Sequence, residues 1–283
     1  MTDVYRWQAL FSKRLELSIV EAMKLFRSAG LEPILIKGWV AARNYPEGRI
    51  RTYSDLDFAV SSDQYPAAEA LRKSDAAERF HIDLHCELRH LDSKPWKQIF
   101  HDSQLVSLEG YDVRIPSDED HLRILATHWL NDRGESKEKL WDIYFAVANR
   151  PADFSWRECL EVVSSNRRTW VLMSIAAAHR YLNLPIDDLP FADEVRNLPE
   201  WLAASLESGW ESGTQLRPLS MSWREPKELF TQLLLRIPPS PIQSAIENEG
   251  DLLQGPRRVY QLQSMGKRAQ RSLEKLFQFV RGS

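Results

Sequence analysis

Two aspartates placed two residues apart, Asp55 and Asp57, are the first candidates for chemistry in this sequence. On a β-strand, residues i and i+2 point to the same face, so the two carboxylates would emerge side by side. Carboxylates this close repel each other, and a hard divalent cation relieves the repulsion while taking the oxygen ligands that it prefers. The spacing alone is common, but the apolar residues Leu56, Phe58 and Val60 place this pair on a core strand. The pattern therefore predicts a metal site.

A third carboxylate, Asp83, lies between Ile82 and Leu84 in another alternating segment. Taken alone, such an aspartate is more often a turn cap or the partner of an arginine. Three aspartates on two adjacent strands, however, can hold two Mg²⁺ ions, or Mn²⁺ in their place, which is the arrangement that promotes an in-line phosphoryl displacement. His85 shares the face of Asp83, which makes it a candidate base or a partner that orients a carboxylate. His128 lies on a helical pattern, and we expect it to be structural.

Lys37 and Gly38 follow the apolar run at residues 33–36 and precede a short helical segment. A glycine lets backbone N–H groups approach phosphate oxygens, and the start of a helix adds a favourable dipole. Lys37 would supply a positive charge to a triphosphate from a turn outside the core. Arg51 is a second candidate because of its planar, forked guanidinium, whereas loop solubility is enough to explain Arg49. We therefore expect Lys37, Gly38 and Arg51 to bind a nucleotide.

In their order and spacing, these segments resemble a family of largely uncharacterised bacterial nucleotidyltransferases. The family belongs to the superfamily that includes DNA polymerase beta and the aminoglycoside nucleotidyltransferases. The resemblance covers roughly residues 30–185. It rests on the runs LIKG at 35–38, Arg-x-x-x-Asp-Leu-Asp-Phe at 51–58, IDLH at 82–85, Pro-Ser at 116–117 and LWDI at 140–143. It implies a small mixed sheet with helices, two Mg²⁺ ions on the aspartates, and a nucleotide at the Lys37-Gly38 turn.

By this resemblance Asp55 and Asp57 would bind both ions, while Asp83 would bind one and help to activate an acceptor hydroxyl. The wider superfamily usually has Gly-Ser at the turn where this chain has Lys37-Gly38, so we expect Lys37 to replace the missing hydroxyl. Some relatives accompany the enzymes of peptide natural products, which makes a peptide or a small molecule a candidate acceptor. The expected reaction transfers a nucleotide monophosphate, or a related phosphate-linked group, from an NTP-type donor.

The elements that must position these residues change in kind near Pro116. Before it, the spacing predicts a helix over 4–29, strands over 33–36, 56–60 and 80–88, and a hairpin at 104–115. After it, Ser117 and Asp120 are typical of a capping box that opens a helix to about residue 130, and the remaining pattern is helical. We therefore expect an α/β (α+β) fold: a mixed nucleotidyltransferase domain with flanking helices over 1–116, and an all-helical domain over 117–283.

The composition is that of a globular protein, with 43% hydrophobic and 27% charged residues and a net charge of −3 over 283 residues. This excludes disordered, collagenous and coiled-coil chains, and also a general polyanion binder. Cys86 and Cys159 form no disulfide framework and no zinc spacing, which fits a reducing compartment. No apolar run reaches the roughly 20 residues of a membrane span, and the first residues lack the apolar core of a signal peptide. We expect a cytoplasmic protein with no membrane partner.

Two alternatives stay open at this point. Between Arg257 and Arg281 seven basic residues stand against the single acid Glu274, a net charge of +6. A solvated terminal helix is the simpler explanation, but a docking surface for an acidic partner or a phosphate backbone would suit an enzyme that modifies nucleic-acid ends. The binding of a nucleic acid to such a surface would weaken steeply as the salt concentration rises. The other alternative is a catalytically idle member of the fold that acts as a binding or regulatory module, against which the complete aspartate trio argues.

Overall fold

The computed structural model describes residues 3–88, 94–212, 227 and 237–281. It divides into two compact units: one comprises residues 1–125 and 141–164, and the other comprises 126–140 and 165–283. Helix α5 (Asp118–Asn131) contributes to both, because the division falls inside it. The contacts thus group the start of α5 and residues 141–164 with the N-terminal residues. The boundary at 116/117 that the sequence suggests for independent domains stays a prediction.

The first unit is built on two small sheets. In the three-stranded sheet, β2 (Leu56–Val60) lies between β1 (Ile34–Leu35), which is antiparallel to it, and β3 (Ile82–Cys86), which is parallel to it. The second sheet is the expected hairpin, formed by β4 (Gln104–Leu108) and β5 (Tyr111–Ile115) with Glu109 and Gly110 in its turn. The prediction of a mixed α/β region with a small mixed sheet is confirmed.

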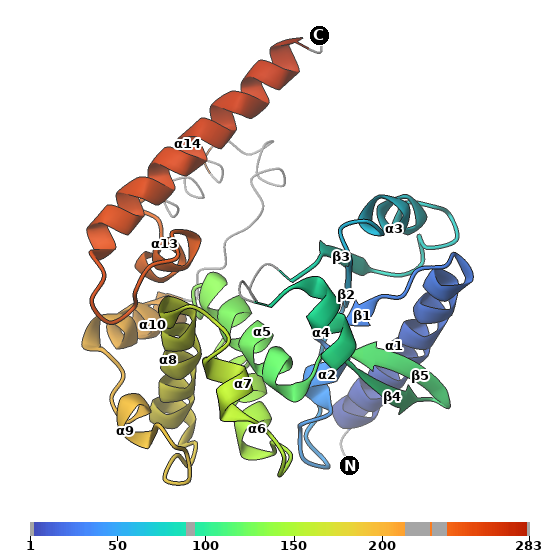
Figure 1. Ribbon diagram of the computed structural model, residues 1–283, viewed down its shortest axis with the longest axis horizontal. Helices are drawn as coiled ribbons and strands as arrows, with labels where there is room; N and C mark the ends of the chain where they lie inside the picture. Colours follow the sequence, from blue (N-terminus) through green and yellow to red (C-terminus); the bar gives the residue numbers. More distant parts are fainter. Residues whose placement is uncertain (1–2, 89–93, 213–226, 228–236, 282–283) are drawn as a thin grey trace. The chain divides into compact units, whose positions relative to one another are not determined.

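Helices surround these sheets in the first unit, and Figure 1 shows α1 running beside the β4–β5 hairpin. Gly30, two residues after the end of the first helix, has φ +74° and lets the chain turn away from it. The helices are α1 (Asp3–Ser28), α2 (Trp39–Ala42), α3 (Tyr65–Arg72), α4 (Trp96–Asp102), the first part of α5, α6 (Leu140–Ala148) and α7 (Trp156–Leu160).

The central strand β2 is buried on both faces. One face packs on α1, where the rings of Phe26 and Phe58 meet edge to face with centroids 5.4 Å apart. The other face includes Ala59, which belongs to a second core with residues of α4 and α5. Asp57 alternates with Phe58 and therefore shares this second face, where it is 5% exposed. A carboxylate enclosed in this way needs a partner of opposite charge.

Buried charges pair with one another at the start of α5. The N–H of Asp120 donates to Ser117 Oγ at 3.2 Å, which confirms the expected cap. The carboxylate of Asp120 is fully buried and contacts both Lys94, at 2.9 Å, and Arg123. Arg123 also donates to the carbonyl of Cys159 at 3.0 Å, which ties α5 to α7. This network stabilises the packing of α5 against α7.

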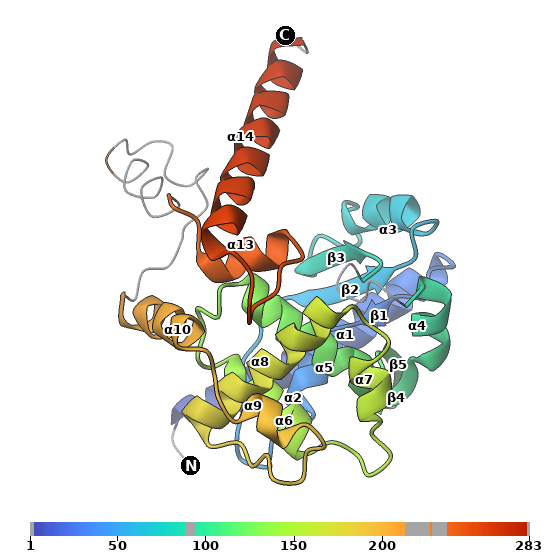
Figure 2. The same ribbon diagram turned by 60° about the vertical axis from the view of Figure 1, so that its left-hand side comes forward.

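The described residues of the second unit form helices joined by loops and no strand, which confirms the helical C-terminal part. It holds the rest of α5, α8 (Ser165–Leu182), α9 (Ala192–Val195), α10 (Glu200–Ser212), α13 (Pro241–Glu247) and α14 (Arg257–Arg281). Helix α14 packs on α13 and continues as one long helix (Figure 2). Two basic side chains of α14 contact other residues of this unit: Arg268 pairs with Glu247 at 2.9 Å, and Arg257 lies over the Trp201 ring. In the described ranges, no helix combines the length and the apolar character needed to cross a membrane.

His121, near the start of α5, is a buried imidazole whose Nε2 has no hydrogen-bond partner among the described residues. Burial, followed by the nearby guanidinium groups of Arg43 and Arg51, lowers the pKa of His121 from 6.5 to about 3. The imidazole is therefore neutral in the folded protein at pH 7 and serves as part of the core.

This depressed pKa predicts a loss of stability in mild acid. The unfolded chain takes up the His121 proton as the pH falls through 6.5, whereas the folded chain does not take it up until about pH 3. The free energy of unfolding should therefore fall by about 2 kcal/mol between pH 6.5 and pH 5. Urea unfolding at several pH values measures this, and His121→Asn, which does not titrate, should remove that part of the loss. An equally steep loss in the variant would contradict the assignment.

Candidate active site

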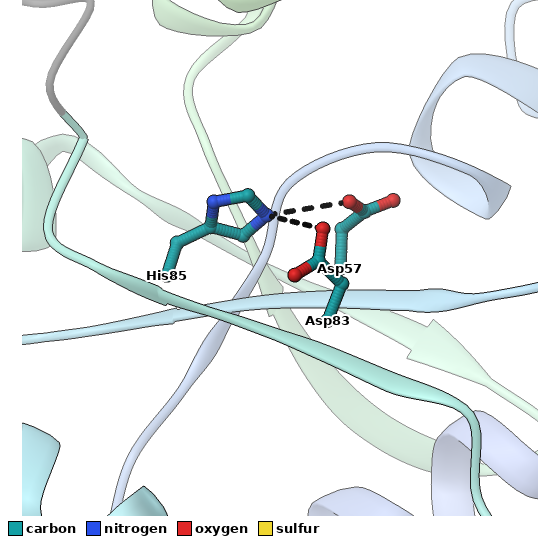
Figure 3. Close-up of side chains that lie close together, drawn as sticks. All are labelled: Asp57, Asp83 and His85. Carbon is teal, nitrogen blue, oxygen red and sulfur yellow. Dashed lines mark hydrogen bonds and ion pairs between the residues drawn. The ribbon is translucent and has the colours of Figure 1, made fainter. Parts of the chain in front are cut away.

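Asp57 and Asp83 lie opposite each other because the parallel register of β2 and β3 pairs these two positions. His85, two residues beyond Asp83, points to the same face. Its Nε2 lies 3.4 Å from Oδ1 of Asp57 and 3.3 Å from Oδ2 of Asp83, and Figure 3 shows the imidazole directed at both carboxylates. Ligand atoms of the three residues all lie within 4.8 Å of one another, so the group can hold a metal ion.

Lys37 joins this group through strand pairing. The N–H of Ile36 donates to the carbonyl of Asp57 at 3.0 Å, which continues the pairing of β1 with β2 and brings the next residue beside Asp57. The Lys37 ammonium lies 2.5 Å from Asp57 Oδ1, and the two side chains are only 11% and 6% exposed. The expectation of a turn residue outside the core was wrong, because the buried carboxylate of Asp57 draws the lysine inward as its counterion.

These neighbours keep Asp57 ionised. Burial alone would raise the pKa of its carboxyl group, but the hydrogen bond from His85 and the charge of Lys37 together outweigh burial. The pKa of Asp57 therefore lies below its usual 3.8. Asp83, in contrast, is 56% exposed at its side chain, and His85 is 33% exposed. The group thus has an enclosed, charge-balanced side at Asp57 and a side open to solvent at Asp83, from which an ion or a phosphate can enter.

Gly38 and Asp55 lie next to this group without belonging to it. Gly38 has φ +62°, and a Cβ there would meet the ring of Tyr53 at 3.3 Å, so both the backbone and the space require glycine. Asp55 is exposed, lies in a bend just before β2, and does not belong to the group that Asp57 forms with Asp83 and His85. Strand β2 begins only at Leu56, so strand alternation does not fix the face to which the Asp55 side chain points. The role of Asp55 as a metal ligand stays a prediction.

Arg51 forms hydrogen bonds with a partner that the sequence patterns do not reveal. Its Nε and Nη2 donate to the two carboxylate oxygens of Asp142, each at 2.7 Å, and the Tyr45 hydroxyl donates to Asp142 Oδ1 at 2.7 Å. Burial alone would lower the pKa of Arg51, but Asp142, with help from Tyr45 and Asp57, raises it. The interaction with Asp57 places this guanidinium within electrostatic range of the candidate site.

One signal in the sequence could have identified Asp142 as a partner. It stands in the apolar run LWDI on α6, and a carboxylate on a buried helix face needs a cation. Nothing local says which cation, because Arg51 lies 91 positions away along the chain. Two other residues have structural contacts: Arg49 lies 3.7 Å above the Trp141 ring, and His128 pairs with Asp132 at 3.2 Å.

The Lys37–Asp57 pair predicts that removal of the Lys37 ammonium lowers the free energy of unfolding by an amount that depends on pH. In Lys37→Met, Asp57 stays buried with His85 alone, so the free energy of unfolding should fall by about 3 kcal/mol at pH 7. The folded-state pKa of Asp57 lies below its unfolded value of 3.8, so the stability from this pair is present above about pH 4 and is lost as the pH falls further. Loss of Lys37 should raise the pKa of Asp57, so the deficit of the variant should shrink as the pH approaches 4.

Urea unfolding of the wild type and of Lys37→Met at pH 7 and pH 4.5 measures this effect. The double variant Lys37→Met/Asp57→Asn is the control, because it removes both charges and should recover part of the loss. A deficit that is the same at both pH values, or a double variant no more stable than Lys37→Met at pH 7, would contradict the pairing.

Comparison with protein families matches residues 1–183 to the model of a family described as uncharacterised nucleotidyltransferase. Neither the curated proteins nor the solved structures contain a match to this chain. The matched segment spans more than half of the 283 residues and includes the strands that carry Asp57, Asp83 and His85 as well as the Lys37-Gly38 turn. The resemblance drawn from the motifs is thereby confirmed: the chain belongs to the uncharacterised nucleotidyltransferase family.

Proposed function

We propose that this protein is a metal-dependent nucleotidyltransferase. It transfers a nucleotide monophosphate, or a related phosphate-linked group, from a nucleoside triphosphate to an acceptor. The observation that carries the proposal is the convergence of Asp57, Asp83 and His85 beside Lys37, in a chain that belongs to a nucleotidyltransferase family. Family membership supports the triphosphate donor, and the geometry of the carboxylates supports the divalent ion.

The chemistry of the donor set suits a divalent cation. Asp57 and Asp83 present oxygen ligands, and the charge of Lys37 neutralises only one of them. We propose Mg²⁺ or Mn²⁺ as the cofactor, with Asp57 and Asp83 as ligands and Asp55 as a further ligand for a second ion. Such ions, when bound, neutralise phosphate charge and lower the pKa of an attacking hydroxyl.

The residues of the chain itself hold the donor. The Lys37 ammonium has three N–H donors, so it can contact a phosphate oxygen while it keeps Asp57 as its counterion. Gly38, which lacks a side chain, lets a phosphate oxygen approach the backbone. Asp142 engages two nitrogens of Arg51 and fixes the plane of its guanidinium, whose fork suits a phosphate. We propose Lys37, Gly38 and Arg51 as the nucleotide-binding residues.

The acceptor is a hydroxyl or phosphate group of a small molecule or a peptide. Nucleic acid is less favoured, because its support is the charge of α14, and Arg257 and Arg268 of that helix already contact Trp201 and Glu247. The cytoplasm is the proposed location, since the described cysteines Cys86 and Cys159 are both free thiols.

Calorimetry and pyrophosphate release test the proposal directly. The full chain is titrated with each common nucleoside triphosphate in the presence of Mg²⁺ or Mn²⁺, and release is followed with peptide and small-molecule acceptors. Binding that requires the ion, together with release, supports the proposal. Tight binding with no release under any condition identifies an idle binding module instead, and absence of binding contradicts both.

Asp83→Asn separates chemistry from binding. This substitution keeps the shape of the side chain but removes the charge that helps to activate the acceptor, so pyrophosphate release should fall on the order of 10²-fold or more. Nucleotide affinity should change much less, because Lys37 and Gly38 hold the triphosphate. Asp75→Asn, an exposed aspartate in the same unit, is the matched control and should behave as the wild type. Near-normal release by Asp83→Asn would remove Asp83 from the site.

The same two measurements decide the role of Asp55. If Asp55 is a ligand to ions that also contact the triphosphate, Asp55→Asn should lose both nucleotide binding and release, in contrast to Asp83→Asn. Thermal unfolding should be unchanged in the absence of nucleotide, because Asp55 is exposed. Wild-type binding and release in Asp55→Asn would restrict the site to Asp57, Asp83 and His85.

A further inference from the structure

The imidazole of His85 lies where its Nε2 can coordinate a metal ion directly. We propose that His85 Nε2 is a ligand of the ion, together with Asp57 and Asp83, and that this nitrogen makes the site prefer Mn²⁺ to Mg²⁺. The inference rests on the proposed metal-dependent function and adds to it the identity of the preferred ion. It also assigns His85 a role other than that of a base or a hydrogen-bond partner of a carboxylate.

The distances around Nε2 are the first argument. It lies 3.4 Å from an oxygen of Asp57 and 3.3 Å from an oxygen of Asp83, nearly the same distance from each. A hydrogen bond from nitrogen to oxygen is usually about 2.9–3.0 Å long, and one N–H cannot point at two acceptors equally well. Two ligands at right angles around an ion with bonds of about 2.1 Å lie about 3.0 Å apart. Nε2 therefore needs to approach each of the two oxygens by only a few tenths of an ångström to share an ion with it, and ligand atoms of the three residues already lie within 4.8 Å of one another.

The charge balance is the second argument. Asp57 already has a counterion, since Lys37 contacts the same oxygen, Oδ1, that faces His85. The ammonium therefore supplies the counterion of Asp57, and the imidazole, which adds only a long hydrogen bond at 3.4 Å, can exchange that bond for an ion. Together, Lys37 and the two aspartates carry a net charge of −1, which is low for a site that must attract Mg²⁺ by charge alone. A neutral nitrogen ligand strengthens binding without adding negative charge, provided that the ion accepts nitrogen.

The preferences of the ions give the third argument. Mg²⁺ is a hard ion that selects oxygen ligands and gives up its water reluctantly. Imidazole suits the divalent ions of the first transition row, while carboxylates suit Mg²⁺, Ca²⁺ and Mn²⁺. Mn²⁺ is accepted by both kinds of donor, so a set of two carboxylates and one imidazole favours it. The partly exposed side chains of Asp83 and His85 leave a route from solvent to the ion.

Pulsed EPR of the full chain with Mn²⁺ alone tests the ligand assignment without any reaction. A directly bound nitrogen modulates the electron spin echo of Mn²⁺, and labelling the protein with ¹⁵N-histidine changes that modulation only if the nitrogen belongs to a histidine. We expect a ¹⁴N modulation that converts to the ¹⁵N pattern in the labelled wild type. This measurement needs no variant, so it stands even if a substitution at His85 affects folding. Absence of a histidine nitrogen signal in the wild type would overturn the inference.

Two variants identify the histidine and measure the preference. His85→Gln should lose the nitrogen signal. His101→Gln should keep it, because His101 is also beside a carboxylate, Asp102 at 3.0 Å, but is 87% exposed and outside the group. By calorimetry, the wild type should bind Mn²⁺ about tenfold or more tightly than Mg²⁺, and His85→Gln should bring the two affinities within about threefold. A signal that persists in His85→Gln, or equal affinities in the wild type, would overturn the inference.

These results are independent of turnover. Histidine-bound Mn²⁺ in a protein that releases no pyrophosphate would contradict the proposed function and leave the metal site standing. Pyrophosphate release with Mg²⁺ in a protein that shows no histidine nitrogen signal would contradict the metal assignment and leave the function standing.

Discussion

The ion pair between Lys37 and Asp57 is the interaction on which the rest of the site depends. Asp57 lies on a strand that is buried on both faces, and an unpaired carboxylate there would cost several kcal/mol. The pairing of β1 with β2 supplies the cation, because it continues through Ile36, and Lys37 is the next residue of the chain. An uncharged side chain at this position could not neutralise Asp57. The lysine therefore allows an ionised aspartate inside the sheet and keeps a positive charge where phosphates are expected.

Around this pair the site changes from enclosed to open. The parallel register of β2 and β3 sets Asp83 opposite Asp57, and the alternation of β3 brings His85 to the same face. One side is buried and held by charge, which fixes the position of ligand atoms before any ion arrives. The other side is partly exposed at Asp83 and His85, which would give the proposed ions and substrate access. Such preorganisation of ligands beside an accessible opening is what phosphoryl transfer requires of a protein.

The sequence predicted those parts of the site that follow from local patterns. Alternation identified both strands and put Asp83 and His85 on one face, and the motifs identified the family. It did not predict the burial of Lys37, because the residue next to a glycine resembles any solvated turn until the strand pairing is known. It did not separate Asp55 from Asp57, because it does not show that β2 begins only at Leu56.

Local sequence patterns could not predict the long-range contacts, for a different reason. The bond between Arg51 and Asp142 joins residues 91 positions apart, and neither residue carries a local sign of its partner. The same holds for His121, whose helical position gives no hint that Arg43 and Arg51 lie near it and that its pKa is depressed. Such contacts depend on how helices pack on the sheet, which periodicity does not specify.

A crystal structure of the full chain with Mn²⁺ and a non-hydrolysable nucleoside triphosphate tests the central claim most directly. Anomalous scattering locates the ion without assumptions about its ligands. We expect an anomalous peak within bonding distance of Asp57, Asp83 and His85, with the triphosphate in contact with Lys37 and Gly38. An ion and nucleotide bound elsewhere on the chain, with the Lys37–Asp57 pair and His85 unchanged, would contradict it.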